Sequence, residues 1–410
     1  MSAGLALVLV VAVAYLAAHL VVDRLARRFR VVSGAEYLLL GILLGPRVSG
    51  LLTADVVHAF APLTTLALGW LGAAVGVRLY LPTLVRVPGI TFRLAFVESV
   101  LTFVVVTAVE AATVAWLYDL PLAGALLPGA ALGGIAVASS SRGVELVSRR
   151  STARSAGLAQ LEVAVLVDSL VAVFAFGLVA SAWHPAVLVG GRPLTTTEWM
   201  VVTLAMGVVA GVLFHLFMRD ERDPDRLFVS LTGGVILVSG AATYAGLSPI
   251  LAALVFGAIL VNTSRNRAEV AAALERVERP LYLVLLVFAG AAWHPTARAG
   301  LWVLPIVLFV IVRACGKVGG ARLATRANRM LPVVGPDWGR GLVGQGGLAL
   351  AIALNYVYQG GGTLPFFVFT AAVASVLVTD LLAARLVESV VAPLVPPPAL
   401  PDAGEAPCND

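Results

Sequence analysis

The sequence has little charge, a single lysine and two cysteines, and it lacks the residue spacings typical of metal sites. Charged residues make up 12% of the chain, against about a quarter in soluble domains. Cys315 and Cys408 give no disulfide framework. The histidines form no HExxH motif, and no GxGxxG follows a strand pattern. These absences argue against an enzyme and against a nucleotide-binding domain, and we expect no cofactor.

Apolar stretches of membrane-spanning length fill the chain instead, and 60% of its residues are apolar. About 20 helical residues cross a hydrocarbon layer of roughly 30 Å, and the chain divides into about thirteen such spans. They lie roughly at 4–22, 35–52, 62–81, 90–117, 121–141, 155–182, 197–218, 227–246, 248–263, 279–295, 300–324, 338–358 and 364–389. We therefore predict an all-α polytopic membrane protein that ends in a disordered proline-rich tail over 391–410.

The arginines support this division of the chain. Lysine and arginine collect in cytoplasmic loops, and alternate loops or span ends here hold 23 arginines on one side. The other side holds only Arg47, Arg192 and Arg298. This asymmetry predicts a bacterial-type inner-membrane protein with its amino terminus outside and its carboxyl terminus in the cytoplasm. Because the arginines lie in short loops, the net charge of +5 does not indicate binding to nucleic acid.

Thirteen spans divide into six, one and six, which is typical of an inverted-topology repeat. The first repeat would cover about 1–182, a linker helix about 197–218, and the second repeat about 227–390. The fifth span would then correspond to the twelfth, and the sixth span to the thirteenth.

An ionisable residue, Asp168, lies in the middle of the sixth span. A carboxylate there costs roughly 2.5–3.5 kcal/mol on insertion scales. Burial disfavours its charge and a nearby cation favours it, so such a group can bind either a proton or a metal cation. The alternative is a purely structural, hydrogen-bonded aspartate. Glu162 lies on a different face and either lines the same cavity or makes an interhelical contact. Glu98 and Glu110, in the fourth span, are interpreted as structural partners of basic residues.

Two basic residues, Arg313 and Lys317, lie four apart and hence on one face of the eleventh span. Lys317 is the only lysine, beside 27 arginines. Lysine can lose its proton when it is buried, whereas arginine effectively cannot. We expect Arg313, the deeper of the two, to neutralise a buried carboxylate. The alternative for Lys317 is snorkelling toward the cytoplasm.

Helix-breaking residues occur in the fifth and twelfth spans. The fifth has Pro128, Gly133, Gly134 and the serines Ser139, Ser140 and Ser141, and the twelfth has Gln345, Gly346 and Gly347. Discontinuous helices in matching positions of two repeats indicate a transport site, because unwound carbonyls and hydroxyls can coordinate a cation. The alternative is close packing through small residues.

Seven segments in a fixed order carry a family resemblance. They are AEYLLLGILLGP (35–46), AVASSSRGVELV (136–147), LVDSLVAVF (166–174), LSPILAALVFGAILVNTS (247–264), RPLYLVLLVFAGA (279–291), RACGK (313–317) and GQGGLALAIAL (344–354). Together they resemble the monovalent cation:proton antiporter superfamily, nearest its Kef-type branch. The resemblance implies a homodimer with crossed discontinuous helices. It implies that Asp168 binds the cation or the proton, with Ser139–Ser141 and Gln345 at the crossing and Arg313 or Lys317 as counter-charge.

Two residues depart from the family pattern. Val167 stands where the family usually has Asp, Asn or Gln, which leaves one carboxylate and favours electroneutral exchange. Arg142 directly follows the serines and could reach into the site. The sequence therefore predicts exchange of Na⁺ or K⁺ for H⁺ by alternating access. Two alternatives stay open, namely a cation channel or leak and a non-transporting sensor or scaffold derived from an antiporter.

Overall fold

The computed structural model describes residues 35–150, 156–185, 188–189, 192–218, 223–264, 267–293, 299–328, 335–360 and 362–391. The span predicted at 4–22 and the tail predicted beyond Val391 lie outside these residues.

The described chain is almost entirely helical. Its first part contains α3 (Ala35–Leu44), α4 (Ala54–Ala59), α5 (Ala61–Val77), α6 (Leu81–Leu84), α7 (Gly89–Tyr118), α8 (Leu122–Val137), α9 (Ser141–Arg150) and α10 (Ala156–Trp183). Its second part contains α11 (Thr196–Met218), α12 (Pro224–Tyr244), α13 (Pro249–Thr263), α14 (Arg267–Ala291), α15 (Ala299–Asn328), the short 3-10 helix η2 (Trp338–Leu342), α16 (Gly347–Gln359) and α17 (Thr363–Val391). Between α10 and α11 lies a small antiparallel hairpin of β1 (Leu188–Val189) and β2 (Arg192–Pro193), which departs from the all-α prediction.

Helix boundaries follow local chemistry. The side chain of Asp223 accepts a hydrogen bond from the backbone nitrogen of Asp225 at 3.0 Å and caps α12. Ser248 caps α13 in the same way, and in both helices a proline occupies the first turn, where its missing N–H costs nothing. α7 ends at Asp119, whose φ of 51° is left-handed and stops the helix.

Each predicted span from residue 35 onward overlaps a described helix, although the helix α3 in the span predicted at 35–52 ends at Leu44. The twelfth span overlaps η2 and α16 together. Within the described ranges, six stretches are long and apolar enough to cross a membrane. There are seven if the two arms of α17, which are bent by 53°, form one span. α5 and α13 are shorter apolar helices. The chain is thus a helical multi-pass membrane protein, and the count of thirteen spans stays a prediction.

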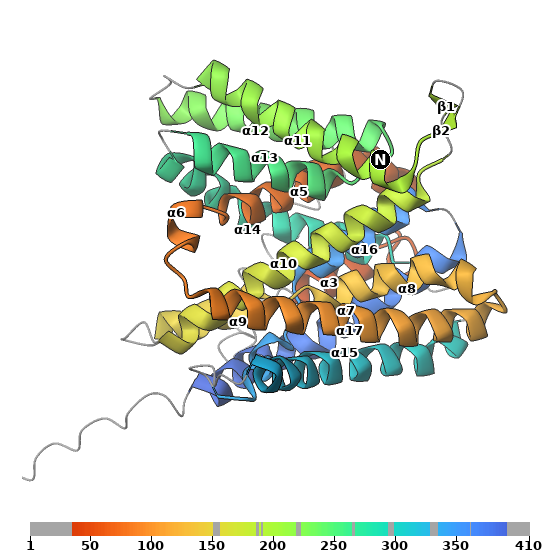
Figure 1. Cartoon of the computed structure of the whole chain (residues 1–410). Helices are drawn as coiled ribbons and strands as arrows, with labels where there is room; N and C mark the ends of the chain where they lie inside the picture. Colours follow the sequence, from red (N-terminus) through yellow and green to blue (C-terminus); the bar gives the residue numbers. More distant parts are fainter. Residues whose placement is uncertain are drawn as a thin grey trace, which may run out of the picture.

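α10 runs between two groups of helices (Figure 1). On one side α5, α11, α12 and α13 lie together, and on the other side lie α7, α8, α15 and α17. α10 contacts α11 and α13 in the first group and α7 and α8 in the second. The middle of α10, which carries Asp168, therefore lies where the two groups meet.

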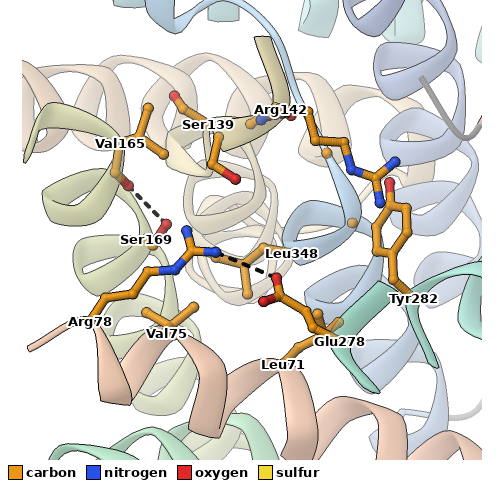
Figure 2. A pocket seen from close by; sticks show the side chains of 14 residues that line it. Leu71, Val75, Arg78, Ser139, Arg142, Val165, Ser169, Glu278, Tyr282 and Leu348 are labelled. Carbon is orange, nitrogen blue, oxygen red and sulfur yellow. Dashed lines mark hydrogen bonds and ion pairs between the residues drawn. The ribbon is translucent and has the colours of Figure 1, made fainter. Parts of the chain in front are cut away.

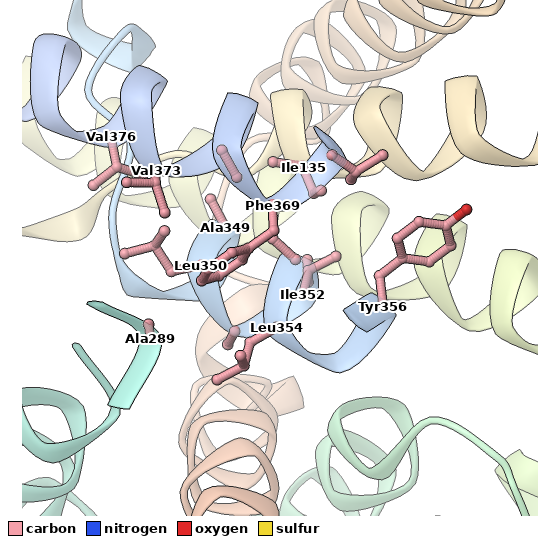
Figure 3. Packing of buried hydrophobic residues seen from close by; sticks show 14 of the residues in the cluster. Ile135, Ala289, Ala349, Leu350, Ile352, Leu354, Tyr356, Phe369, Val373 and Val376 are labelled. Carbon is pink, nitrogen blue, oxygen red and sulfur yellow. The ribbon is translucent and has the colours of Figure 1, made fainter. Parts of the chain in front are cut away.

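α16 is enclosed by α8, α14 and α17 (Figure 3). Its residues Leu350 and Ile352 are fully buried and belong to one apolar cluster with Ile135 of α8 and Phe369 of α17. This packing fixes the position of the first turn of α16, which borders the site described below.

Glycines let some helices of the first group approach each other closely. A Cβ atom added at Gly257 of α13 would overlap the backbone of Ala73 in α5, and one at Gly72 of α5 would overlap Ile250 in α13. Small residues serve this purpose in membrane helices, because the apolar lipid supplies no hydrophobic drive for association.

Gly257→Ala should therefore destabilise the fold. Overpacking of a dense interface costs roughly 1–3 kcal/mol, so we expect a lower thermal midpoint for the purified protein in detergent. The matched control is Gly240→Ala in α12, where an added Cβ meets no atom within 4 Å. Equal midpoints for the two variants would contradict the close-approach interpretation.

Candidate functional site

Two interruptions of helical structure touch each other. α8 ends at Val137 and α9 begins at Ser141, while η2 ends at Leu342 and α16 begins at Gly347. The backbone nitrogen of Ser140 donates to the carbonyl oxygen of Gly344 at 2.9 Å, which joins the two interruptions directly. Both breaks fall inside the predicted fifth and twelfth spans. Pro128, Gly133 and Gly134, however, lie within continuous α8, so the serine segment marks the break and these residues do not.

Gln345 strengthens this junction. Its side-chain nitrogen donates to the carbonyl oxygen of Ile135 at 2.7 Å, and its backbone nitrogen donates to the hydroxyl of Thr379 at 3.2 Å. The side chain is fully buried, and its amide oxygen has no hydrogen-bond partner among the described residues.

Arg313 holds the ends of the interrupted helices. Its Nε donates to the carbonyl oxygen of Ala136 at 2.9 Å and its Nη2 to that of Ala138 at 3.3 Å, while its Nη1 donates to that of Val343. A helix end leaves carbonyls without intrahelical partners, and the guanidinium fork satisfies three of them at once. The side chain is fully buried. We expected Arg313 to pair with a carboxylate, but its hydrogen bonds go to backbone carbonyls.

Asp168 lies at the centre of the site and is fully buried. Its Oδ2 is 2.7 Å from the ammonium of Lys317 and 2.5 Å from the hydroxyl of Ser139. Its Oδ1 is 2.7 Å from the hydroxyl of Ser99. The Ser139 hydroxyl also lies 2.9 Å from the carbonyl oxygen of Leu342. Four separate parts of the chain therefore meet at one carboxylate.

Lys317 is also fully buried. Its side chain therefore does not snorkel toward the cytoplasm, which was the alternative interpretation. Besides Asp168, its ammonium lies 3.4 Å from each carboxylate oxygen of Glu98. The Oε1 of Glu98 accepts a hydrogen bond from the hydroxyl of Thr102 at 2.8 Å. The interpretation of Glu98 as a partner of a basic residue fits this contact.

Three residues of α7 thus reach the site, and the sequence pattern indicated only Glu98 among them. Ser99 and Thr102 are hydroxyl residues of the kind common in membrane helices. The only sequence signal was their spacing, which places Thr102 one turn after Glu98 and Ser99 beside it in an otherwise apolar helix. Glu110, the other glutamate of α7, is fully buried, and neither of its oxygens has a hydrogen-bond partner among the described residues.

A cavity of about 70 Å³ lies beside this cluster (Figure 2). The interrupted helices line it with Ser139, Ser140, Ser141, Gly346 and Gly347, together with Ser169 of α10. α5 and α14 close its opposite wall, where Arg78 forms an ion pair with Glu278 at 3.5 Å. Ser139 and Ser140 are only 5% and 8% exposed, so the cavity ends at these two serines, and the Ser139 hydroxyl contacts Asp168.

Arg142 reaches this cavity, as its position after the serines suggested. Its guanidinium lies 3.5 Å from the ring centroid of Tyr282, within the range of a cation–π contact. Tyr282 also packs against the start of α16, where a Cβ at Gly347 would overlap its ring. Arg142 therefore places a positive charge at the wall of the cavity (Figure 2).

Two predicted cavity residues lie elsewhere. Val167 is buried in an apolar cluster with Leu94 and Trp338, because adjacent helical residues project in different directions. Glu162 is half-buried and is not among the residues that line the cavity. Val167 does not line this cavity either.

Comparison with known proteins shows which structures have a similar fold. No family model matches the sequence, and no curated protein matches it. Two solved structures of the sodium proton antiporter MjNhaP1 from Methanocaldococcus jannaschii are similar in fold. One, at pH 8, has a TM-score of 0.68 and 15% sequence identity, and the match covers 96% of each chain. The other, an electron microscopy structure, has a TM-score of 0.67 and 14% identity, covering 97% of this chain and 100% of that one.

The chain therefore has the fold of a sodium proton antiporter. The resemblance predicted from the seven sequence segments is confirmed at the level of the fold.

Arg313→Lys should lower the thermal stability of the protein. A lysine ammonium is a compact charge and cannot reproduce the planar fork that binds three carbonyls. We expect a clear fall in the thermal midpoint in detergent, and a smaller fall for Arg322→Lys, whose ion pair with Asp337 is exposed. An Arg313→Lys midpoint equal to that of the unsubstituted protein would contradict a structural role for the guanidinium.

Proposed function

We propose that the protein is a secondary transporter that exchanges a monovalent cation, Na⁺ or K⁺, for H⁺ at Asp168. The observation that carries this proposal is the fully buried ion pair between Asp168 and Lys317, 2.7 Å apart, beside two interrupted helices. The antiporter fold of the chain supports it.

The chemistry of exchange follows from burial. A carboxylate without water must be neutralised by a proton or compensated by a cation, because an uncompensated buried charge is strongly unfavourable. The Ser139 hydroxyl lies 2.5 Å from Asp168 and 2.9 Å from the carbonyl oxygen of Leu342, so it joins two hard oxygen donors at the site. Such donors suit an alkali cation. In the described arrangement the Lys317 ammonium and two hydroxyls occupy the carboxylate, so an incoming cation has to displace the ammonium.

Alternating access would bring this site to each side of the membrane in turn. We propose thirteen spans arranged as two inverted six-helix repeats, with α8–α9 and η2–α16 as the matching interrupted helices. The contact between Ser140 and Gly344 supports such a pair. The arginine asymmetry of the loops supports an inner-membrane protein with the amino terminus outside, and it would make the cavity beside Arg78 and Arg142 cytoplasmic. We further propose a homodimer, which rests on the family resemblance alone.

One other function has a specific observation in its favour. Arg142 places a positive charge at the cavity wall, and Val167 replaces the polar neighbour of the aspartate. Both features fit an antiporter-derived sensor that binds a cation without moving it. Flux measurements separate the two functions, since a sensor would bind Na⁺ or K⁺ without exchange. A channel would instead carry current that follows the membrane voltage, without proton counterflow.

Asp168→Asn should abolish exchange. An amide can neither carry the proton nor balance a cation, so we expect loss of cation-dependent dequenching of a pH-sensitive dye in everted vesicles. The control is Glu269→Gln, which removes an exposed carboxylate of α14 and should leave exchange unchanged. Exchange by Asp168→Asn at the rate of the unsubstituted protein would refute the site assignment.

A further inference from the structure

A second carboxylate stands beside the proposed exchange site, on a different helix from Asp168. Glu98 of α7 is fully buried, and both of its oxygens lie 3.4 Å from the ammonium of Lys317. The same ammonium is 2.7 Å from Asp168. Lys317 therefore lies between two carboxylates and is closer to the one that would bind the transported ion.

The charges of this cluster balance. Glu98 and Asp168 contribute two negative charges when ionised, and Lys317 and Arg313 contribute two positive ones. Arg313 is held by the carbonyls of Ala136, Ala138 and Val343 and is not available to move. Lys317 has a flexible stem and three donors. It is the only charged group of the cluster that can shift from one partner to another.

The surroundings of Glu98 hold it in place for such a shift. The Thr102 hydroxyl donates to its Oε1 at 2.8 Å and orients the carboxylate. Gly316 and Gly320 flank Lys317 in α15 and let that helix approach α7 closely. A Cβ at Gly320 would lie 3.2 Å from the carbonyl oxygen of Glu98, and one at Gly316 would lie 3.4 Å from Thr102. The separation between Lys317 and Glu98 is thus set by close helix packing.

We propose that Glu98 is a positioning residue that receives the Lys317 ammonium when a cation takes its place at Asp168. This inference rests on the proposed function. The ammonium keeps its proton, breaks its contact with Asp168 and pairs with Glu98. No charge is left without a partner, because the cation compensates Asp168 and Lys317 compensates Glu98.

The shift of the Lys317 ammonium from Asp168 to Glu98 determines how many protons are exchanged for each cation. With Lys317 charged throughout, the cluster carries one net positive charge when a cation occupies Asp168. It carries the same charge when a proton occupies Asp168 instead. One cation then exchanges for one proton, and the proton comes from Asp168 alone. Electroneutral exchange here follows from a second carboxylate that binds the lysine, in addition to the absence of a carboxylate at Val167.

Removal of the Glu98 charge tests the proposal. In Glu98→Gln the displaced ammonium has no carboxylate to pair with, so it either stays on Asp168 or gives up its proton. We expect the apparent KM for Na⁺ and for K⁺ to rise at least tenfold near neutral pH, with the maximal rate retained. The rise should shrink as the pH increases, because a deprotonated lysine no longer competes with the cation.

This pH profile has to arise from Lys317 or from the groups that face it. Among the described residues they are Glu98 from α7, Asp168 from α10 and Arg313 from its own helix, with hydroxyls from Ser99, Thr102 and Ser139. Arginine does not titrate in this range. A steeper pH dependence in Glu98→Gln than in the unsubstituted protein therefore reports the lysine.

Two further variants control for folding and for burial. Glu98→Asp keeps the carboxylate and should restore most of the cation affinity. Glu110→Gln removes the other buried glutamate of α7, which does not contact the cluster, and should leave the KM and its pH profile unchanged. Cation-dependent thermal stabilisation in detergent should give the same order of affinities without any transport.

The outcomes separate the two proposals. If Asp168→Asn loses exchange and Glu98→Gln keeps the KM and the pH profile of the unsubstituted protein, the role of Glu98 is overturned and the function stands. Unaltered exchange by Asp168→Asn refutes the proposed function. If the unsubstituted protein binds Na⁺ or K⁺ without exchange, the binding measurements still decide whether Glu98 receives the lysine.

Discussion

The burial of four charged side chains in a helical membrane bundle constrains the rest of this structure. Asp168, Glu98, Lys317 and Arg313 are all shielded from solvent, and each would be costly to bury alone. The Lys317 ammonium compensates both carboxylates, together with hydroxyls at Asp168 and with Thr102 at Glu98. Arg313 is compensated by backbone carbonyls. The carboxylate of Asp168 is where this balance can change, because its partner Lys317 has a second carboxylate within reach.

The interrupted helices and the charged cluster depend on each other. The breaks after Val137 and Leu342 expose carbonyls that an intact helix would have bonded internally. Arg313 satisfies three of those carbonyls and thereby holds the two breaks together. The break also places Ser139, at the end of the cavity, against Asp168. A straight helix through this segment would bond its carbonyl groups internally and leave none for Arg313.

Sequence reasoning identified those parts of this site that stand out against an apolar background. Asp168 is an isolated ionisable residue in a long apolar run, and Lys317 is the only lysine beside 27 arginines. These two features pointed to function. The long apolar helices also overlap the stretches that the hydropathy pattern placed from residue 35 onward. The partners of Arg313 could not be predicted in this way, because they are backbone carbonyls that come together only when two segments 203 residues apart meet. Val167 was misplaced for a simpler reason, since adjacent helical residues project in different directions.

Competition between one proton and one cation at Asp168 is the central claim, and the pH dependence of cation binding tests it most directly. The dissociation constant for Na⁺ or K⁺, measured on the purified unsubstituted protein in detergent, should rise as the pH falls, by no more than tenfold for each unit of pH, because one proton competes with one cation. At high pH it should level off. A dissociation constant that does not change with pH, or a slope near two protons per cation, would contradict the account.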